Sequence, residues 1–333
     1  MPRIQFQDLY NEIHRVLLQT GLAAPRAALV ARLFAENQRD GIYSHGLNRF
    51  AGFVALLKNG RLDLQAVPEK VGALGAVEQW DGKMGVGLWN AHFAMGRAIE
   101  LARAHGIGCL GLRNTNHWMR AGAYGLQAAD AGCIGICWTN TIPLMPPWGS
   151  AEVKIGNNPL VIAVPRRDGH LLLDMAMSQF SNGKLEVWRR QGKDLPIAGG
   201  YDRAGNLTQK PAEILASRRP LPIGHWKGSA LAVMLDTAAA LVAGGKSSHQ
   251  IGRQNAEYAV SQVFIAINVA ALAGESEVNE MVDAIVENLH TASPLVAGEP
   301  VRYPGEGMLR TRRESLENGV LVDENLLAEL RAM

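Results

Sequence analysis

Apolar residues near the start of the chain recur at intervals of three and four, which places them on one face of a helix: Leu9, Ile13, Val16 and Leu17. Gly21 ends this helix, and Pro25 begins a second one, since proline is tolerated in the first turn. Gly41 ends the second helix, and a third is expected from about Leu47 to Leu57. Residues 1–70 are therefore expected to form a helical subdomain.

Beyond residue 70 the pattern alternates between short apolar runs, typical of strands, and longer runs with helical spacing. Arg166 to Gly169 form a turn between two expected strands, which indicates a hairpin. Hairpins combined with helical crossovers predict an α/β fold, in which helices flank a mixed sheet over residues 71–309. A C-terminal helix at 310–333 is expected to join the helical subdomain. Strands are expected at 107–112, 134–138, 159–164, 171–176 and 263–269, and helices at 89–105, 121–131, 229–243 and 277–290.

The composition is that of a well-packed protein without a nucleic-acid partner. Of the 333 residues, 47% are hydrophobic, and 33 basic residues nearly balance 31 acidic ones. Binding of nucleic-acid phosphates relies on a clustered basic excess, which this balance does not provide. The N-terminus lacks an apolar signal-peptide core, and the longest apolar run, Ala230 to Val242, is too short to span a membrane. We therefore expect a soluble, cytoplasmic protein with no membrane partner.

The three cysteines, Cys109, Cys133 and Cys137, are too few for a disulfide scaffold. Cys133 and Cys137 are four residues apart in an apolar, strand-like run, so both face one side of the strand. They are either metal ligands or, as we expect, small buried apolar side chains. No metal site is predicted.

The chain lacks the glycine fingerprint by which most nicotinamide-dependent enzymes are recognised. None of its 36 glycines belongs to a Gly-x-Gly-x-x-Gly motif between a strand and a helix, and the phosphate-binding motif of nucleotide triphosphatases is absent as well. These patterns alone leave the cofactor unidentified.

His45 and Arg49 form the most informative local pair. They are four residues apart at the start of the third expected helix, so they lie on one face about one turn apart. Arg49 could hold a carboxylate through two parallel hydrogen bonds while His45 handles a proton. Taken alone, the pair also fits an ordinary surface or core contact.

Polar segments lie at the ends of three expected strands, where open α/β sheets often bind ligands. They are Arg113–Arg120, which includes His117, and the shorter segments Thr139–Thr141 and Gly156–Pro159. Each alone fits an ordinary polar loop, but together they indicate a single cleft.

Three further segments have the chemistry of a nucleotide site. Asp174 lies in an apolar strand and needs hydrogen-bond donors, either ribose hydroxyls or backbone N–H groups. Gly224–Ser229 is a glycine-flanked turn entering a helix, where the helix N-terminus and Lys227 would attract phosphate. Pro304–Gly307 is a tight turn. Both turns also fit a purely structural role.

In their order and spacing, these motifs resemble the type 2 malate/L-lactate dehydrogenase family, also called L-sulfolactate dehydrogenase-like. The resemblance covers essentially the whole chain and implies an NAD(P)-dependent oxidoreductase on a non-Rossmann fold, which would explain the missing glycine fingerprint. Further segments resemble one branch of the family in particular, for example Gly75–Asp81 and Met145–Gly149. The members of that branch reduce a diketo sugar acid. The family motifs are Tyr43–Arg49, Asn116–Trp118, Gly156–Pro159, Asp174–Ser178, Trp226–Gly228 and Pro304–Glu306.

The resemblance also implies the roles of individual residues. His45 would donate the proton, with Arg49 and His117 beside it in the catalytic site. The protein would be a homodimer whose active sites lie near the subunit interface. The cofactor, NADH in preference to NADPH, would contact three segments: His170, Leu171, Leu172, Leu173, Asp174, Met175 and Ala176; Trp226 and Lys227; and Gly305, Glu306 and Gly307.

In the mechanism that follows, hydride reaches C2 of the substrate while a protonated His45 donates to the developing alkoxide. His117 would donate a hydrogen bond to the same oxygen, and Arg49 would hold the C1 carboxylate. Asp174 near a ribose would repel a 2′-phosphate and favour NADH. Two alternatives are a family member acting on malate, L-lactate, ureidoglycolate or a cyclic imino acid, and a non-catalytic small-molecule binding protein.

Overall fold

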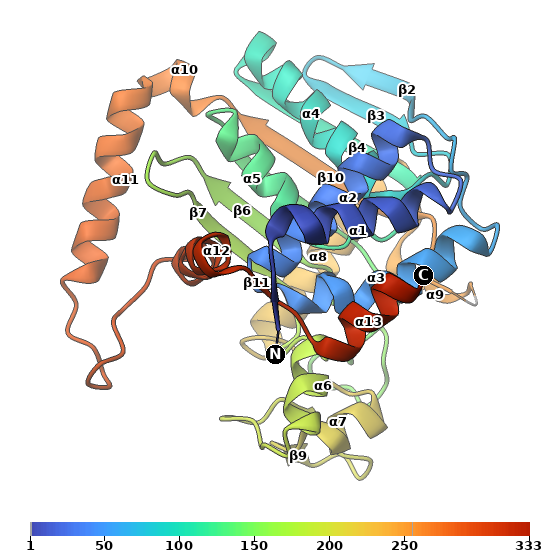
Figure 1. The fold of residues 1–333 in the computed structure, drawn as a ribbon, viewed down its shortest axis with the longest axis vertical. Helices are drawn as coiled ribbons and strands as arrows, with labels where there is room; N and C mark the ends of the chain where they lie inside the picture. Colours follow the sequence, from blue (N-terminus) through green and yellow to red (C-terminus); the bar gives the residue numbers. More distant parts are fainter. Residues whose placement is uncertain (1, 255) are drawn as a thin grey trace.

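A mixed seven-stranded sheet forms the centre of the computed structural model, which describes residues 2–254 and 256–333 (Figure 1). The order of its strands is β2-β3-β4-β10-β5-β6-β7. β3 and β4 are parallel, and every other neighbouring pair is antiparallel, so the predicted mixed sheet and the β6–β7 hairpin are confirmed. The strands are β2 (Glu69–Leu74), β3 (Val77–Asp81), β4 (Ile107–Thr115), β5 (Ile134–Thr139), β6 (Leu160–Val164), β7 (Leu171–Met175) and β10 (Val260–Ile267).

Each face of the sheet has its own helices and its own core. Neighbouring side chains of a strand point to opposite faces, and Phe264 and Val263 of β10 accordingly belong to different cores. The Phe264 side is covered by α4 (Gly87–His105) and α5 (Gly122–Asp130), and the Val263 side by α8 (Trp226–Ala243).

The N-terminal helices α1 (Phe6–Leu18), α2 (Ala24–Arg39) and α3 (Leu47–Lys58) match the predicted ones. The four apolar residues whose spacing predicted α1 form its buried face, and each is at most 2% exposed. Side chains of these helices share one core with the sheet, so the helices cover the α4–α5 layer.

The prediction of one C-terminal helix at 310–333 was wrong. Two helices, α12 (Glu306–Asn318) and α13 (Glu324–Ala332), are separated by β11 (Val320–Leu321), which pairs with β1 (Arg3–Ile4). Gly319 ends α12 with a φ of +87°, a conformation that favours glycine, and the Asp323 side chain caps α13. α13 contacts α1 and α3, so the C-terminus does join the N-terminal helices.

The pattern also missed a small lobe built from α6 (Asn182–Arg190), β8 (Gly200–Tyr201), β9 (Leu207–Thr208) and α7 (Pro211–Ser217). The lobe extends from the bottom of the molecule in Figure 1 and has a small core of its own, around Leu185, Leu195 and Ile214. Four short or peripheral helices complete the fold: the 3-10 helix η1 (Tyr43–His45), α9 (Ser248–Gly252), α10 (Val269–Ala273) and α11 (Glu275–His290).

α8 is apolar on the side that packs against the sheet and on the opposite side as well. Its 18 residues have a mean hydropathy of 1.2, long and apolar enough to cross a membrane by length and composition alone, and 33% of them are buried. One side packs on the sheet through Ala232, Leu235 and Ala239. The opposite side exposes Trp226, Val233, Met234 and Leu241.

Candidate active site

The polar segments that were predicted at strand ends lie at the same end of the sheet. β4 and β5 are both antiparallel to β10, so their carboxyl ends lie beside the amino end of β10. β6 is antiparallel to β5 and β7 to β6, which brings the start of β6 and the end of β7 to the same edge. His117, Thr141, Asn158 and Asp174 therefore share one end of the sheet.

Most of these polar side chains serve the fold. Asn140 and Asn158 are fully buried, and both ends of each amide are hydrogen-bonded to other protein groups. Arg113 and Asn114 both donate to Asp81. The polar strand ends lie together at one edge of the sheet, and His117 of the segment Arg113–Arg120 stacks against His45.

His45 and His117 form the centre of the candidate site. Their rings stack with centroids 5.7 Å apart and planes 16° apart, although the residues come from η1 and from the loop after β4. Both side chains are half-buried. Arg49, in the first turn of α3, is exposed, and its charge acts on both rings. We call His45, Arg49 and His117 the catalytic cluster.

A backbone hydrogen bond determines the tautomer of His117. The N–H of Met119 donates to His117 Nδ1 over 3.0 Å, so a neutral His117 carries its hydrogen on Nε2. Met119 itself adopts a φ of +63°, which is uncommon outside glycine. His45 is less constrained, because its Nδ1 lies 3.2 Å from the Ser44 hydroxyl, which can either donate or accept.

Both histidines are neutral at pH 7 in the protein without ligands. Burial, together with the charges of Arg49 and Arg120, lowers the pKa of His45 to about 4. Burial and the neighbouring His45 and Arg49 lower the pKa of His117 to about 3. The expected mechanism uses a protonated His45, and the low pKa means that the ring is neutral before a substrate binds. The sequence pattern reveals neither the burial of this ring nor the nearby charge of Arg120.

Sequence reasoning missed Glu257, which lies three residues before β10. Its side chain is half-buried, and Oε2 accepts the backbone N–H of Ile142 over 3.2 Å. Burial raises the pKa of Glu257, while the charge of Arg49 lowers it. The only sequence signal that could have identified Glu257 is the presence of an acidic residue shortly before a strand.

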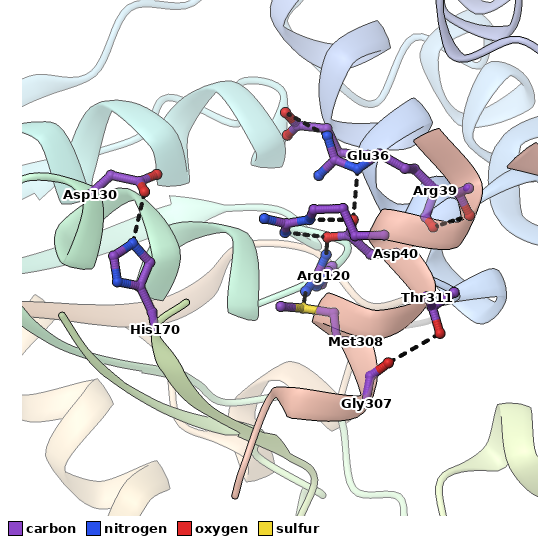
Figure 2. A network of polar contacts seen from close by, with 11 residues as sticks. Glu36, Arg39, Asp40, Arg120, Asp130, His170, Gly307, Met308 and Thr311 are labelled. Atoms are coloured by element: carbon purple, nitrogen blue, oxygen red, sulfur yellow. Dashed lines mark hydrogen bonds and ion pairs between the residues drawn. The ribbon is translucent and has the colours of Figure 1, made fainter. Parts of the chain in front are cut away.

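A buried ionic network around Asp40 joins the end of α2 and the loop after β4 to α12 (Figure 2). Asp40, only 2% exposed, pairs with Arg120 at 2.8 Å, Arg312 at 2.7 Å and Arg39 at 2.7 Å. These guanidinium groups hold the pKa of Asp40 well below its usual range, against the effect of burial. Arg120 also contacts the sulfur of Met308, in the first turn of α12.

The predicted cofactor segments come together around β7. The N–H of Leu172 donates to Pro304 O over 2.8 Å, which holds the 304–307 turn against the strand. A Cβ on Gly305, whose φ is +99°, would lie 3.1 Å from the Leu172 nitrogen, so the turn requires glycine. Beyond β7, Met177 O accepts the N–H of Ile223, which leads into the start of α8.

Within β7 the predicted contact residues differ in what they can offer a ligand. Leu172 packs into the core, and the ring nitrogens of His170 are engaged by Asp130 and by the N–H of Arg166 (Figure 2 shows the Asp130 contact). Asp174 is exposed and accepts the N–H of Gly122 on one oxygen, and among the described residues no hydrogen bond engages the other. One oxygen of Asp174 thus has a backbone donor, and the other could accept a hydrogen bond from a ribose hydroxyl.

Two helices begin within the predicted cofactor segments, each a few residues earlier than expected. Trp226 and Lys227 form the first turn of α8 and are exposed, and Glu306 and Gly307 begin α12. Backbone N–H groups at a helix N-terminus, with a lysine beside them, suit a phosphate. Leu171, Leu173, Met175 and Ala176 can offer a ligand only backbone groups and apolar surface.

Cys133 and Cys137 are fully buried in the main core, as expected for small apolar side chains. Within residues 2–254 and 256–333, no three or more histidine, cysteine or acidic side chains are grouped as metal ligands.

Comparison with known proteins extends these observations. The sequence model described as malate/L-lactate dehydrogenase matches residues 4–331. The chain is 45% identical to 2,3-diketo-L-gulonate reductase of Citrobacter koseri, and 44% identical to that of Klebsiella pneumoniae, over 99% of this chain and 100% of each relative. The structure of malate dehydrogenase from Pyrococcus horikoshii superimposes with a TM-score of 0.89 at 28% identity, over 99% of this chain and 94% of that one.

Proposed function

Because this chain belongs to the malate/L-lactate dehydrogenase family, we propose that it reduces 2,3-diketo-L-gulonate to 3-keto-L-gulonate with a nicotinamide cofactor. The chain is an oxidoreductase of oxo and hydroxy acids, like the relatives it matches over its whole length. The observation that carries the proposal is the stacked pair of His45 and His117 next to the charge of Arg49.

The residues around β7 fit a nicotinamide dinucleotide. Gly305 approaches β7 so closely that a side chain at this turn would crowd the backbone of Leu172. The α8 N-terminus with Lys227 suits a phosphate, and the second oxygen of Asp174 suits a ribose hydroxyl. A carboxylate beside the ribose would repel a 2′-phosphate, so we propose NADH as the preferred cofactor.

The cofactor, when bound, supplies the hydride that reduces the carbonyl. Arg49 binds the C1 carboxylate and thereby orients the substrate. His117 donates its Nε2–H to the carbonyl oxygen, and this bond strengthens as negative charge develops there. His45 supplies the proton: a carboxylate at Arg49 offsets the positive charge that lowers the pKa of His45, so substrate binding favours its protonation.

Oxidation of NADH by the purified protein tests this function, with freshly prepared 2,3-diketo-L-gulonate compared with pyruvate and oxaloacetate. We expect the highest kcat/KM for 2,3-diketo-L-gulonate. His45→Gln should lower kcat by about 10²- to 10⁴-fold, the usual contribution of a general acid. A higher kcat/KM for pyruvate or oxaloacetate would instead support a lactate or malate dehydrogenase. His249→Gln, an exposed histidine on α9, is the control.

We also propose that the protein is a cytoplasmic homodimer. Its three cysteines are free, as is usual in a reducing compartment. The exposed apolar side of α8 would be covered by the same side of a second copy. Trp226 and Lys227 begin this helix, so an interface along α8 would place each cofactor site close to it.

A further inference from the structure

The small lobe lies directly against the residue that precedes His45. A Cβ on Gly183, in the first turn of α6, would lie 2.9 Å from the Cβ of Ser44, in η1. Two non-bonded carbon atoms do not approach this closely, because their attraction is greatest at about 3.5–4.0 Å. Only glycine therefore lets α6 pack on η1 at this separation.

Ser44 lies between this helix and the ring of His45. Its hydroxyl is 3.2 Å from Nδ1 of His45, and in the part of the chain that the structure describes no other group is hydrogen-bonded to that ring. A Cβ on Gly183 would lie 3.7 Å from the same hydroxyl oxygen. A serine side chain has three staggered positions, and the contact with α6 limits which of them Ser44 can adopt. The helix thus restricts the direction of the hydroxyl that meets the His45 ring.

α6 has a support of its own, separate from the catalytic cluster. Leu185 of this helix is fully buried in the core of the lobe. The two ends of the lobe are joined where the N–H of Gln179 donates to Leu221 O over 2.7 Å. Because these contacts fix the position of α6, the helix can hold Ser44 in place.

We propose that Gly183 is a positioning residue for the reduction: by packing on Ser44, α6 holds the Ser44 hydroxyl at Nδ1 of His45. This inference rests on the proposed function. When His45 is protonated, both ring nitrogens carry a hydrogen, and the hydroxyl oxygen accepts the Nδ1–H. The proton on Nε2 passes to the developing alkoxide, and the neutral ring keeps its Nδ1–H on Ser44. A hydrogen bond to the charged ring favours that state, so Ser44 helps His45 to carry its proton.

Gly183→Ala tests this role, because it adds the Cβ that meets Ser44. With NADH and 2,3-diketo-L-gulonate, we expect kcat to fall about 10-fold or more, as for the loss of a hydrogen bond to a charged group. A proton donor is active below its pKa, so a less favoured charged ring should also move the decline of kcat at high pH to lower pH. Gly96→Ala, within α4, is the control: its Cβ would meet Gln127 Nε2 at 3.5 Å, an ordinary contact, so kcat and its pH profile should match those of the wild type.

Two substitutions of Ser44 show whether the effect passes through this residue. Ser44→Ala keeps the Cβ but lacks the hydroxyl, so we expect it to fold normally and to shift the pH profile of kcat in the same direction as Gly183→Ala. Ser44→Gly removes the Cβ, so adding Gly183→Ala to it should cause no further loss of kcat.

In an active reductase, two results would overturn the positioning role alone. One is a wild-type pH profile in Ser44→Ala, and the other is an equal loss of kcat from Gly183→Ala with and without Ser44→Gly. A wild-type protein that reduces none of 2,3-diketo-L-gulonate, pyruvate and oxaloacetate with either NADH or NADPH would overturn the proposed function and this inference with it.

Discussion

The backbone N–H of Met119 donates to Nδ1 of His117 over 3.0 Å, and this contact distinguishes the two stacked histidines. Protonating Nδ1 of His117 would set two N–H donors against each other, so the ring stays neutral with its hydrogen on Nε2. The Ser44 hydroxyl next to His45 accepts either protonation state. His117 is thus suited to a permanent hydrogen-bond donor, and His45 to the proton carrier.

This division predicts different outcomes for two isosteric changes at position 117. The amide nitrogen of glutamine can replace Nε2–H, whereas that of asparagine reaches only the Nδ1 position. We expect His117→Gln to keep a kcat at least about 10-fold above that of His117→Asn, because removal of one oxyanion donor costs about 10²- to 10³-fold. Steady-state kinetics with 2,3-diketo-L-gulonate measures the difference. Equal losses in both variants would mean that His117 transfers the proton itself.

The stability of the protein should fall in mild acid because of the same two residues. The pKa of His45 is lowered to about 4 and that of His117 to about 3, whereas unfolded histidine titrates near 6.5. Between about pH 6.5 and 4 the unfolded chain therefore binds protons that the native protein does not, and the free energy of unfolding decreases as the pH falls. In urea unfolding across this range, the free energy of unfolding of His45→Gln should depend less steeply on pH than that of the wild type. The difference in slope should correspond to at most one bound proton. An unchanged slope, equal to that of the control His249→Gln, would contradict the low pKa.

Local periodicity was sufficient for much of the fold. The apolar stripe that includes Leu9 and Ile13 predicted α1, and the turn at Arg166–Gly169 predicted the β6–β7 hairpin. Both predictions succeeded because the signal for each element lies within its own segment of the sequence. The lobe around Leu185 was missed because its elements are short and share a very small core. At the site, the protonation state of His45 depends on burial and on Arg120, neither of which a local pattern contains.

The outward side of α8 gives a test of the assembly. Met234 is 64% exposed and Leu241 72% exposed, about two turns apart on an apolar helix. Met234→Glu would place a charge inside an apolar interface, so we expect a dimer that dissociates to monomers in light scattering coupled to size exclusion. Leu74→Glu, at an 85% exposed residue of the β2–β3 hairpin, is the control and should stay dimeric. Two outcomes argue against α8 as the interface: a monomeric wild-type protein or a dimeric Met234→Glu variant.

Asp40 should matter for stability and for cofactor binding together. Asp40→Asn leaves Arg120, only 3% exposed, without its carboxylate, and breaking a buried ion pair in this way costs about 3–5 kcal/mol. The exposed pair Arg3–Glu314 is the comparison, and Glu314→Gln should cost no more than about 1 kcal/mol of unfolding free energy in urea. Because Arg120 also contacts Met308 at the start of α12, we expect the Asp40 variant to bind NADH more weakly in fluorescence titrations, whereas Glu314→Gln binds it normally. A destabilised Asp40→Asn protein with unchanged NADH affinity would show that the network stabilises the fold without positioning the 305–307 turn.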